Sequence, residues 1–200
     1  MPAGSYSVLR EDGSVEATED FRCAPGPMGW RYFSEVDTTE PVPHHETIDV
    51  AVDADWRPVR LRVDSGDHQL LLEADGARLA GWRDGDPIET PWHPEMHLDY
   101  LSPAFNAITC QRLAATTEID VVFVDPYALE PHLVRQRYER IGTEDVETPV
   151  GTFTTVRWTY TALDSGWTSE LWCAQDVVVR YERLFRLERY EAGASGPRPE

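Results

Sequence analysis

The chain has 200 residues, of which 36 are Asp or Glu and 18 are Arg, with no Lys, so its formal charge is −18. A chain with this charge repels phosphates and anionic headgroups, which argues against nucleic acids and anionic membrane surfaces as partners. Hydrophobic residues make up 41% of the chain and aromatic residues 10%, enough for one domain with its own core and not for bulk disorder.

Neither a membrane span nor a secretory signal is visible in the sequence. The longest apolar stretches have about five residues, against the roughly twenty that a spanning helix needs. The first twenty residues lack a basic start followed by an apolar segment, so we expect a cytoplasmic location and no stable membrane insertion. Cys23, Cys110 and Cys173 are an odd number without metal-ligand spacing, and we expect them to be reduced and structural.

Most of the chain alternates apolar and polar residues with a period of two, which is typical of half-buried strands. In one such run Ile48, Val50 and Val52 share a face, and the turn signal Asp75-Gly76 predicts a hairpin between two others. The predicted strands are Thr47–Asp53, Pro58–Val63, Gln69–Glu73, Ala77–Trp82, Ile119–Val124, Phe153–Thr161, Ser169–Cys173 and Val177–Phe185. Seven or more strands with hairpin spacing indicate a large antiparallel sheet.

One segment, Ser102–Leu113, breaks this pattern and predicts a helix. Ser102 is a favourable N-cap residue, and Pro103 follows at the first helical position. The residues Leu133–Ile141 fit a helix or a strand equally well. A twisted sheet with one helix is most simply arranged with the sheet curled and the helix on its concave face. Because this helix has only about three turns, the rest of the concave face is either filled by side chains or left as a pocket.

The predicted helix also carries a family resemblance. Asp99, Pro103, Asn106, Arg112 and Leu113 match the "D…(S/T)P-x-x-N…R-L" segment of the bacterial Putative glycolipid-binding family, which this chain resembles. The resemblance implies the open half-barrel fold of the lipoprotein-carrier proteins and a lipid-like ligand.

Two later segments support the resemblance, Tyr138–Phe153 with its "G-x-E…(T/V)P-x-G-x-F" run and the closing strand Val177–Phe185. It favours a strand for Leu133–Ile141. The family's closing strand commonly carries a Tyr-Pro-Gly turn, where this chain has Tyr181-Glu182-Arg183. Lipoprotein carriers are exported, and because we expect no signal here, a shuttle role between membranes is not inferred.

We therefore predict a mainly β fold, a curled antiparallel sheet in the form of an open half-barrel with a short helix on the concave face. The polar, weakly patterned residues 1–26 include one short candidate strand at Tyr6–Arg10 and predict an N-terminal arm or edge strand. Residues 27–191 form the single half-barrel domain, and residues 192–200 form a disordered tail.

The densest polar cluster is the segment that precedes the helix. On a strand, His93, Glu95, His97 and Asp99 would share one face, and their side chains are of the metal-ligand type. Pro94 makes a regular strand doubtful, and no second ligand-rich segment is present. We favour a polar loop and expect neither a metal site nor a cofactor.

Catalytic motifs are absent from the sequence. There is no G-x-S-x-G elbow, no Cys/His pair at a known spacing and no phosphate-cradling glycine loop. Proton-transfer chemistry needs only a shaped cavity and one acid or base, so a cyclase or isomerase using His93, His97 or Asp99 stays open. The arginines at positions 180, 183, 186 and 189 favour a solvated, salt-bridged edge over an anion clamp.

Aromatic residues give the main indication of function. In Phe153–Thr161, Trp158 and Tyr160 share one face, and aromatic side chains with a polar atom suit a pocket for an amphipathic ligand. A plain aromatic core explains them equally well. We therefore expect non-covalent binding of a lipid-like or other apolar small molecule, with an enzyme in the same cavity or a structural protein with a filled core as alternatives. The expected ligand-binding residues are Trp82, Trp92, Tyr100, Phe105, Asn106, Arg112, Trp158, Tyr160 and Trp172.

Overall fold

The computed structural model describes residues 1–38 and 42–193, which form fifteen strands and one helix. The elements are β1 (Ala3–Leu9), β2 (Val15–Gly26), β3 (Gly29–Thr38), β4 (His44–Val52), β5 (Pro58–Asp64), β6 (Gln69–Asp75), β7 (Arg78–Arg83), β8 (Asp86–Pro91), β9 (His97–Asp99), α1 (Pro103–Arg112), β10 (Thr117–Val124), β11 (Pro131–Thr148), β12 (Gly151–Ala162), β13 (Thr168–Ala174), β14 (Val177–Tyr181) and β15 (Phe185–Glu191). The mainly β fold predicted from the sequence is confirmed.

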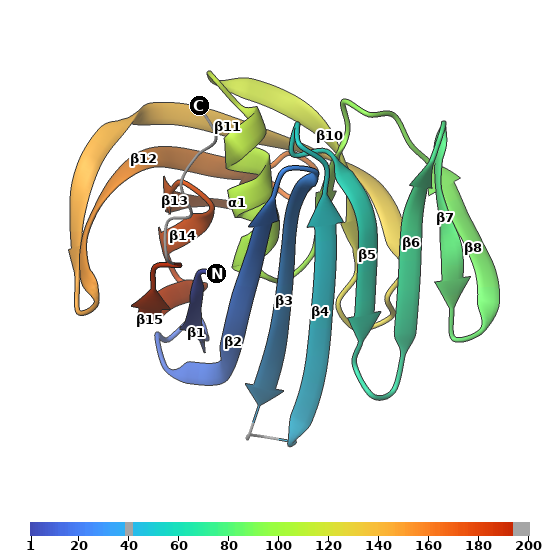
Figure 1. The fold of residues 1–200 in the computed structure, drawn as a ribbon, viewed down its shortest axis with the longest axis horizontal. Coiled ribbons are helices and arrows are strands. Elements are labelled where there is room, and N and C mark those ends of the chain that lie inside the picture. The colour runs from blue at the N-terminus through green and yellow to red at the C-terminus, as the bar shows by residue number, and fades with distance from the viewer. Residues whose placement is uncertain (39–41, 194–200) are drawn as a thin grey trace.

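All these strands belong to one sheet, in the order β8-β7-β6-β5-β4-β3-β2-β1-β15-β14-β13-β12-β11-β10-β9. Neighbouring strands run antiparallel except β9 and β10, which run parallel. β8 and β9 are the two ends of this order, so the described sheet curls without closing (Figure 1). The predicted open half-barrel is confirmed.

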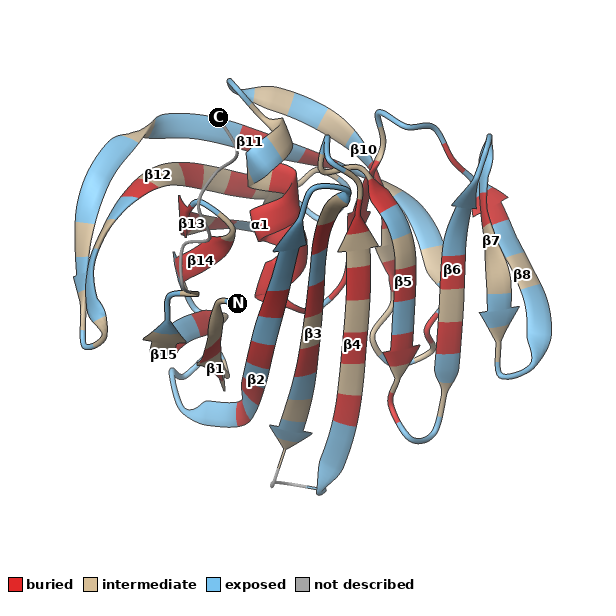
Figure 2. Cartoon of the chain, viewed as in Figure 1, coloured by how far each residue is buried: buried red, intermediate tan, exposed pale blue. Residues whose placement is uncertain are grey.

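The parallel pair explains the position of the helix. Two parallel neighbours cannot be joined by a tight hairpin and need a crossover connection, and α1 lies in the connection from β9 to β10. The helix begins as predicted, with Ser102 as N-cap and Pro103 as the first helical residue. All seven residues from Pro103 to Thr109 are buried, so α1 is surrounded by the curled sheet for most of its length (Figures 1 and 2).

The start of the chain lies in the middle of the sheet, so the prediction of an arm or edge strand for residues 1–26 is wrong. β1 pairs with β2 on one side and with β15, from the other end of the chain, on the other. Pairing between distant segments leaves no local turn signal in the sequence. Ala192 and Gly193 follow β15 outside any strand, and the remainder of the predicted tail, residues 194–200, lies outside the described residues.

The predicted closing strand Val177–Phe185 is in fact two strands. β14 ends at Tyr181, a turn covers Glu182–Leu184, and β15 begins at Phe185. Arg183 has φ +64°, a left-handed conformation that favours glycine. The turn therefore lies where the family commonly has Tyr-Pro-Gly, although Arg183 stands at the glycine position.

The other predicted strands are present, and Leu133–Ile141 lies within β11, as the resemblance implied. Hairpins join them in sequence, including β4–β5, where Asp53 Oδ1 accepts hydrogen bonds from the backbone N–H groups of Asp55 and Arg57. At the β2–β3 turn Gly29 has φ +141°, and a Cβ there would lie 2.0 Å from the Val52 carbonyl oxygen, so only glycine fits.

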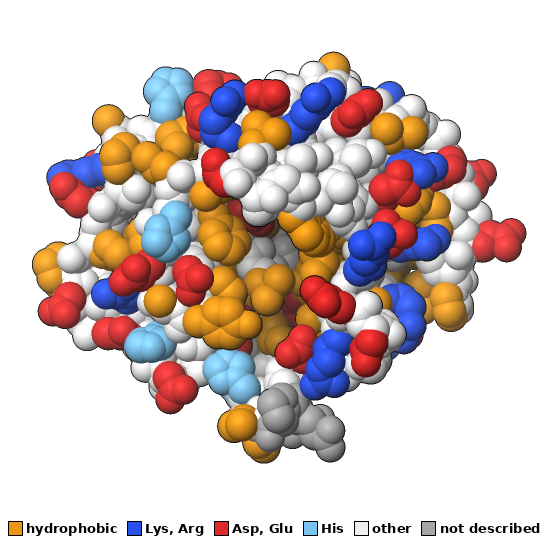
Figure 3. All heavy atoms as spheres, turned by 180° about the vertical axis from the view of Figure 1, so that it is seen from behind, with side chains coloured by type: hydrophobic (Ala, Val, Ile, Leu, Met, Phe, Trp, Pro, Cys, Tyr) orange, Lys and Arg blue, Asp and Glu red, His pale blue; other side chains and the backbone are white. Residues whose placement is uncertain are grey.

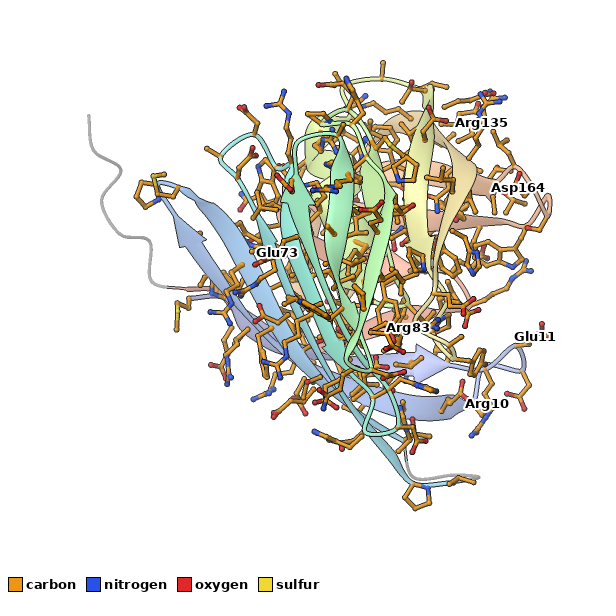
Figure 4. The ribbon with its side chains drawn as sticks, turned by 90° about the vertical axis from the view of Figure 1, so that its right-hand side faces the viewer. Arg10, Glu11, Glu73, Arg83, Arg135 and Asp164 are labelled. Atoms are coloured by element: carbon orange, nitrogen blue, oxygen red, sulfur yellow. The ribbon has the colours of Figure 1, made fainter. Side chains whose placement is uncertain are left out.

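Arg83 links the two halves of the curled sheet. Its guanidinium, on β7 near one end of the strand order, donates to the Glu130 carboxylate in the β10–β11 turn at 2.5 Å. In the side view, Arg83 lies between the two halves of the molecule, and Arg135 of β11 lies near Asp164 of the β12–β13 turn (Figure 4). No helix within residues 1–38 and 42–193 is long and apolar enough to cross a membrane.

Candidate functional site

The concave face carries a cluster of aromatic side chains from β11 and β12. Trp158 and Tyr160 alternate along β12 with outward residues, and Tyr138 lies opposite Tyr160 in the register. The Tyr138 ring is 5.3 Å from the Tyr160 ring and 6.3 Å from the Trp158 ring, and all three residues are buried. The predicted inward face of β12 is confirmed.

Trp167 extends this cluster to the surface. It lies in the β12–β13 turn, it is 40% exposed, and its ring is 5.6 Å from Tyr160 and 6.4 Å from Tyr181. Tyr181 comes from β14 and is buried. Aromatic surface thus continues from the concave face to solvent, and Trp167 is its accessible end.

The face opposite to the view of Figure 1 is hollowed at its centre, and hydrophobic side chains gather around the hollow (Figure 3). Depressions elsewhere on the surface have other linings. One of about 520 Å³ lies over β3–β7 and is bordered by Arg62, Leu71 and Trp82. Another of about 360 Å³ lies between the β11–β12 hairpin and the turn at Arg183. Neither of these two is lined by Phe105 or Trp158.

Two buried carboxyl groups tie the β9–α1 connection to the opposite half of the sheet. Glu19 of β2 accepts hydrogen bonds at one oxygen from Tyr32 OH at 2.8 Å and from Ser102 Oγ at 2.7 Å. Glu46 of β4 accepts one from Tyr100 OH at 2.7 Å. The helix N-cap residue therefore binds β2 as well as its own helix.

The other side of the helix is tied to β11. Asn106 Nδ2 donates to Tyr138 OH at 2.9 Å, and Gln136 Nε2 donates to Asp99 at 2.6 Å. The Phe105 ring packs 6.0 Å from the Tyr100 ring. Asn106 is buried, so this hydrogen bond ties the inner side of the helix to β11.

Arg112 holds the helix at its other end. The half-buried guanidinium donates to the Met96 and Pro94 carbonyl oxygens at 2.6 and 2.8 Å. Both described acceptors belong to the loop before β9, so Arg112 holds that loop against the helix. Its expected contact with a ligand stays a prediction.

Burial raises the pKa of the inner carboxyl groups. Desolvation raises the pKa of Glu46 to about 7 and that of Asp99 to about 6, although hydrogen bonds from Tyr100 and Gln136 act the other way. The pKa of Glu19 is also raised by burial, against the effect of its hydroxyl donors. None of these three shifts includes a contribution from a basic group. Among the described residues, these three carboxyls therefore have no basic partner.

Several buried polar atoms at this face are incompletely paired. Among the described residues Trp158 Nε1 has no hydrogen-bond partner, and Glu19 Oε2 has only the nearby Ser34 hydroxyl, which lowers the pKa of Glu19. Buried polar groups are nearly always satisfied, so a partner of these atoms, a water or a ligand, is expected.

Two of the predicted ligand-binding residues lie on the convex face and not on the concave face where they were expected. Trp82 is 54% exposed beside Leu71 on the outer side of the sheet. Trp172 lies opposite Arg157 in the register, whereas the inward Trp158 lies opposite Leu171. The guanidinium groups of Arg157 and Arg180 cover the Trp172 ring. Side-chain direction alternates along a strand, and the sequence did not settle which alternate set of β13 faces inward.

The remaining predicted residues are buried near the helix or the β8 edge. Tyr100 and Phe105 contact each other beside the Glu46 carboxyl. Trp92 is buried just after β8, where its backbone N–H donates to the Ala77 carbonyl. A binding role for these three side chains stays a prediction.

The predicted polar loop is partly a strand, because His97 and Asp99 lie on β9. His97 is buried, its Nδ1 is 3.1 Å from Thr109 Oγ1, and desolvation lowers its pKa to about 3. His93 and Glu95 are exposed on the preceding loop. Within the described ranges, no three His, Cys, Asp or Glu side chains lie close enough together to hold one metal ion.

Sequence reasoning missed Glu19, Glu46 and Trp167. Both glutamates occupy inward positions of alternating runs, Glu19 between Ala17 and Phe21 and Glu46 before Ile48. An acidic residue in the apolar phase of a strand was the available signal. Trp167 lies in a turn, where the period-two pattern gives no direction.

Comparison with known proteins places this fold and chain in a family. A search of the curated proteins gave no match. A crystal structure of a DUF1089 family protein from Pseudomonas aeruginosa is similar, with 22% identity and a TM-score of 0.60 over 84% of this chain and 91% of that one. A β-barrel-like protein of the domain of unknown function DUF1849 from Brucella abortus has 8% identity and a TM-score of 0.56, over 95% and 96% of the two chains. At these identities the likeness shows the fold alone. The profile of the family described as Putative glycolipid-binding matches residues 10–186, so the chain belongs to that family.

Proposed function

We propose that the protein binds a lipid-like or other apolar small molecule, without a covalent bond, on the concave side of its half-barrel. The observation that carries the proposal is the hollow ringed by hydrophobic side chains (Figure 3). The exposed ring of Trp167, in contact with the buried rings of Tyr160 and Tyr181, supports it, because exposed aromatic surface joined to an apolar interior is typical of ligand sites. The family's description agrees with this class of ligand.

The packing of the helix limits where such a ligand lies. Phe105 and Trp158 are almost fully buried within the core, so the ligand is expected against the outer aromatic residues and not in place of α1. A ligand that buries about 300 Å² of apolar surface gains on the order of 7 kcal/mol at roughly 25 cal/mol per Å². After the cost of association, micromolar affinity is the expected ceiling.

Native mass spectrometry of the protein purified from its own host tests the proposal. We expect a fraction of the molecules to carry one additional small molecule that organic solvent extracts and that rebinds at one equivalent. Purified protein that carries nothing, and that also fails to take up any member of a varied panel of amphiphiles, would contradict the proposal and leave a structural role.

A further inference from the structure

We infer that the polar head of the ligand is positively charged, an amine whose ammonium group lies beside Glu46 and Glu19. The inference rests on the proposed function and deepens it by naming the ligand class, a cationic amphiphile. Its basis is the charge of the concave face, which holds carboxyl groups without basic partners.

The first observation is the chemistry of the groups that hold these carboxyls. Tyr32 and Ser102 donate to Glu19, and Tyr100 donates to Glu46. All three donors are hydroxyls, and among the residues that the structure describes neither carboxyl has an arginine or histidine within ion-pair distance. Buried acids are normally paired with a base, so this face lacks one positive charge that an occupant can supply.

The second observation is geometric. Glu19, Val36 and Glu46 lie in register across β2, β3 and β4, which places the two glutamates on the same face about 10 Å apart at the backbone, two strand spacings. Glu46 is 8% exposed and Glu19 is fully buried. An incoming head therefore meets Glu46 first, with Glu19 behind it.

The third observation is a pair of buried acceptor atoms. Glu19 Oε2 and Ser34 Oγ are fully buried and lie close together, where the Ser34 hydroxyl lowers the pKa of Glu19, and neither forms a hydrogen bond to another described group. An ammonium group has three donors and no acceptor, and a carboxylate oxygen and a hydroxyl oxygen are both acceptors for it. Charge-assisted hydrogen bonds of this kind are roughly twice as strong as neutral ones.

The surroundings agree with a cation. The formal charge of −18 attracts cations at long range and repels anions. The buried Tyr100 ring beside Glu46 is an aromatic group of the kind on which ammonium groups bind favourably. An anionic head would meet two buried carboxyls and no base, which is the arrangement that costs most.

A matched series of dodecyl ligands tests the inference in calorimetric titrations at neutral pH, below their micellar concentrations. The ligands are dodecylamine, its uncharged acetamide, dodecanol, dodecyl glucoside and dodecanoate. We expect dodecylamine to bind at one equivalent and at least tenfold more tightly than the acetamide, and dodecanoate to bind most weakly. These comparisons use the wild-type protein, so they do not depend on the folding of a variant.

Glu46→Gln keeps the shape of the protonated side chain and removes its ability to ionise. We expect it to weaken dodecylamine binding about tenfold and to leave dodecanol binding unchanged. Glu35→Gln is the matched control, because Glu35 is exposed and precedes Val36 on the opposite face of β3. Equal weakening by the two variants would mean general attraction to an acidic surface and would overturn the inference.

The series also separates the inference from the proposed function. If dodecyl glucoside or dodecanol binds as tightly as the amine, the inference of a positively charged head is wrong, while the proposed binding of an apolar molecule stands. If no dodecyl compound binds, the proposed function itself fails.

Discussion

Carboxyl groups on the two faces of the sheet have different hydrogen-bond partners. On the convex face the Asp49 carboxylate accepts two hydrogen bonds from Arg31, at 2.6 and 2.7 Å, and one from Arg60 at 3.2 Å. On the concave face Glu19 and Glu46 are held by hydroxyl groups alone among the described residues. Burial thus raises the pKa of the inner carboxyls, whereas Asp49 on the outer face is paired with two arginines.

The difference implies unequal contributions to stability. Exposed ion pairs contribute about 0–1 kcal/mol, because water and salt screen them and long side chains lose freedom. A buried acceptor that satisfies several donors contributes more, since its removal leaves those donors unsatisfied at about 1–3 kcal/mol each.

Removing Glu19 has the largest expected effect. Glu19→Ala leaves the Tyr32 and Ser102 hydroxyls without their acceptor and opens a cavity, so it is expected to lower the free energy of unfolding by about 4 kcal/mol. Asp49→Ala on the convex face is expected to cost about 1 kcal/mol. Urea unfolding of both variants measures the difference, and an equal or larger loss in Asp49→Ala would contradict the contrast.

The stability of the fold is expected to fall with rising pH because of Glu46. A carboxyl whose folded-state pKa is raised stabilises the fold fully below its unfolded pKa of about 4.5 and loses this contribution as pH rises through the folded value, about 7 for Glu46. Because of this raised pKa, the contribution of Glu46 to the free energy of unfolding is expected to fall by about 2–3 kcal/mol from pH 5 to pH 8. Glu46→Gln should make that part of the urea-derived profile shallower, with the slope due to Asp99 remaining, whereas Asp49→Asn should leave the profile unchanged. A profile that the first variant does not change would place the pKa of Glu46 near its ordinary value.

The tie between the helix and β11 is expected to have a smaller effect. Asn106→Ala leaves Tyr138 OH without its partner and should cost about 1–3 kcal/mol. In a double-mutant cycle with Tyr138→Phe the two losses should not add, because both remove the same hydrogen bond. Additive losses, or an unchanged melting temperature in Asn106→Ala, would show that α1 is not docked through this bond.

The smallest prediction concerns the β14–β15 turn. Arg183 has φ +64°, a conformation that costs a non-glycine residue about 1 kcal/mol. Arg183→Gly is therefore expected to raise the free energy of unfolding by up to about 1 kcal/mol, less the entropy that glycine gains in the unfolded chain. Gln175→Gly, also in a left-handed turn at φ +52°, is a parallel test. A clear loss of stability in both variants would contradict the account of strain.

The sequence predicted those features that depend on neighbours along the chain. Alternation predicted the inward side of β4 and β12, and the Ser102-Pro103 pair predicted the start of α1. Pairings between distant segments were not accessible, which is why the central position of β1 beside β15 was missed. Predictions for the candidate site were the least accurate. An error of one residue in the phase of a strand reverses the predicted face of a side chain, and for this reason Trp82 and Trp172 were expected on the concave face.

Tryptophan emission during titration with N-phenylnaphthylamine, an uncharged apolar probe, tests the central claim that the concave side binds ligand. We expect one saturable site of micromolar affinity, with energy transfer that falls more in Trp167→Phe, at the rim of the concave aromatic cluster, than in Trp82→Phe. It should persist in Trp82→Phe, whose exposed ring lies on the convex face. Failure to saturate, or a signal that depends on Trp82 and not on Trp167, would contradict the claim.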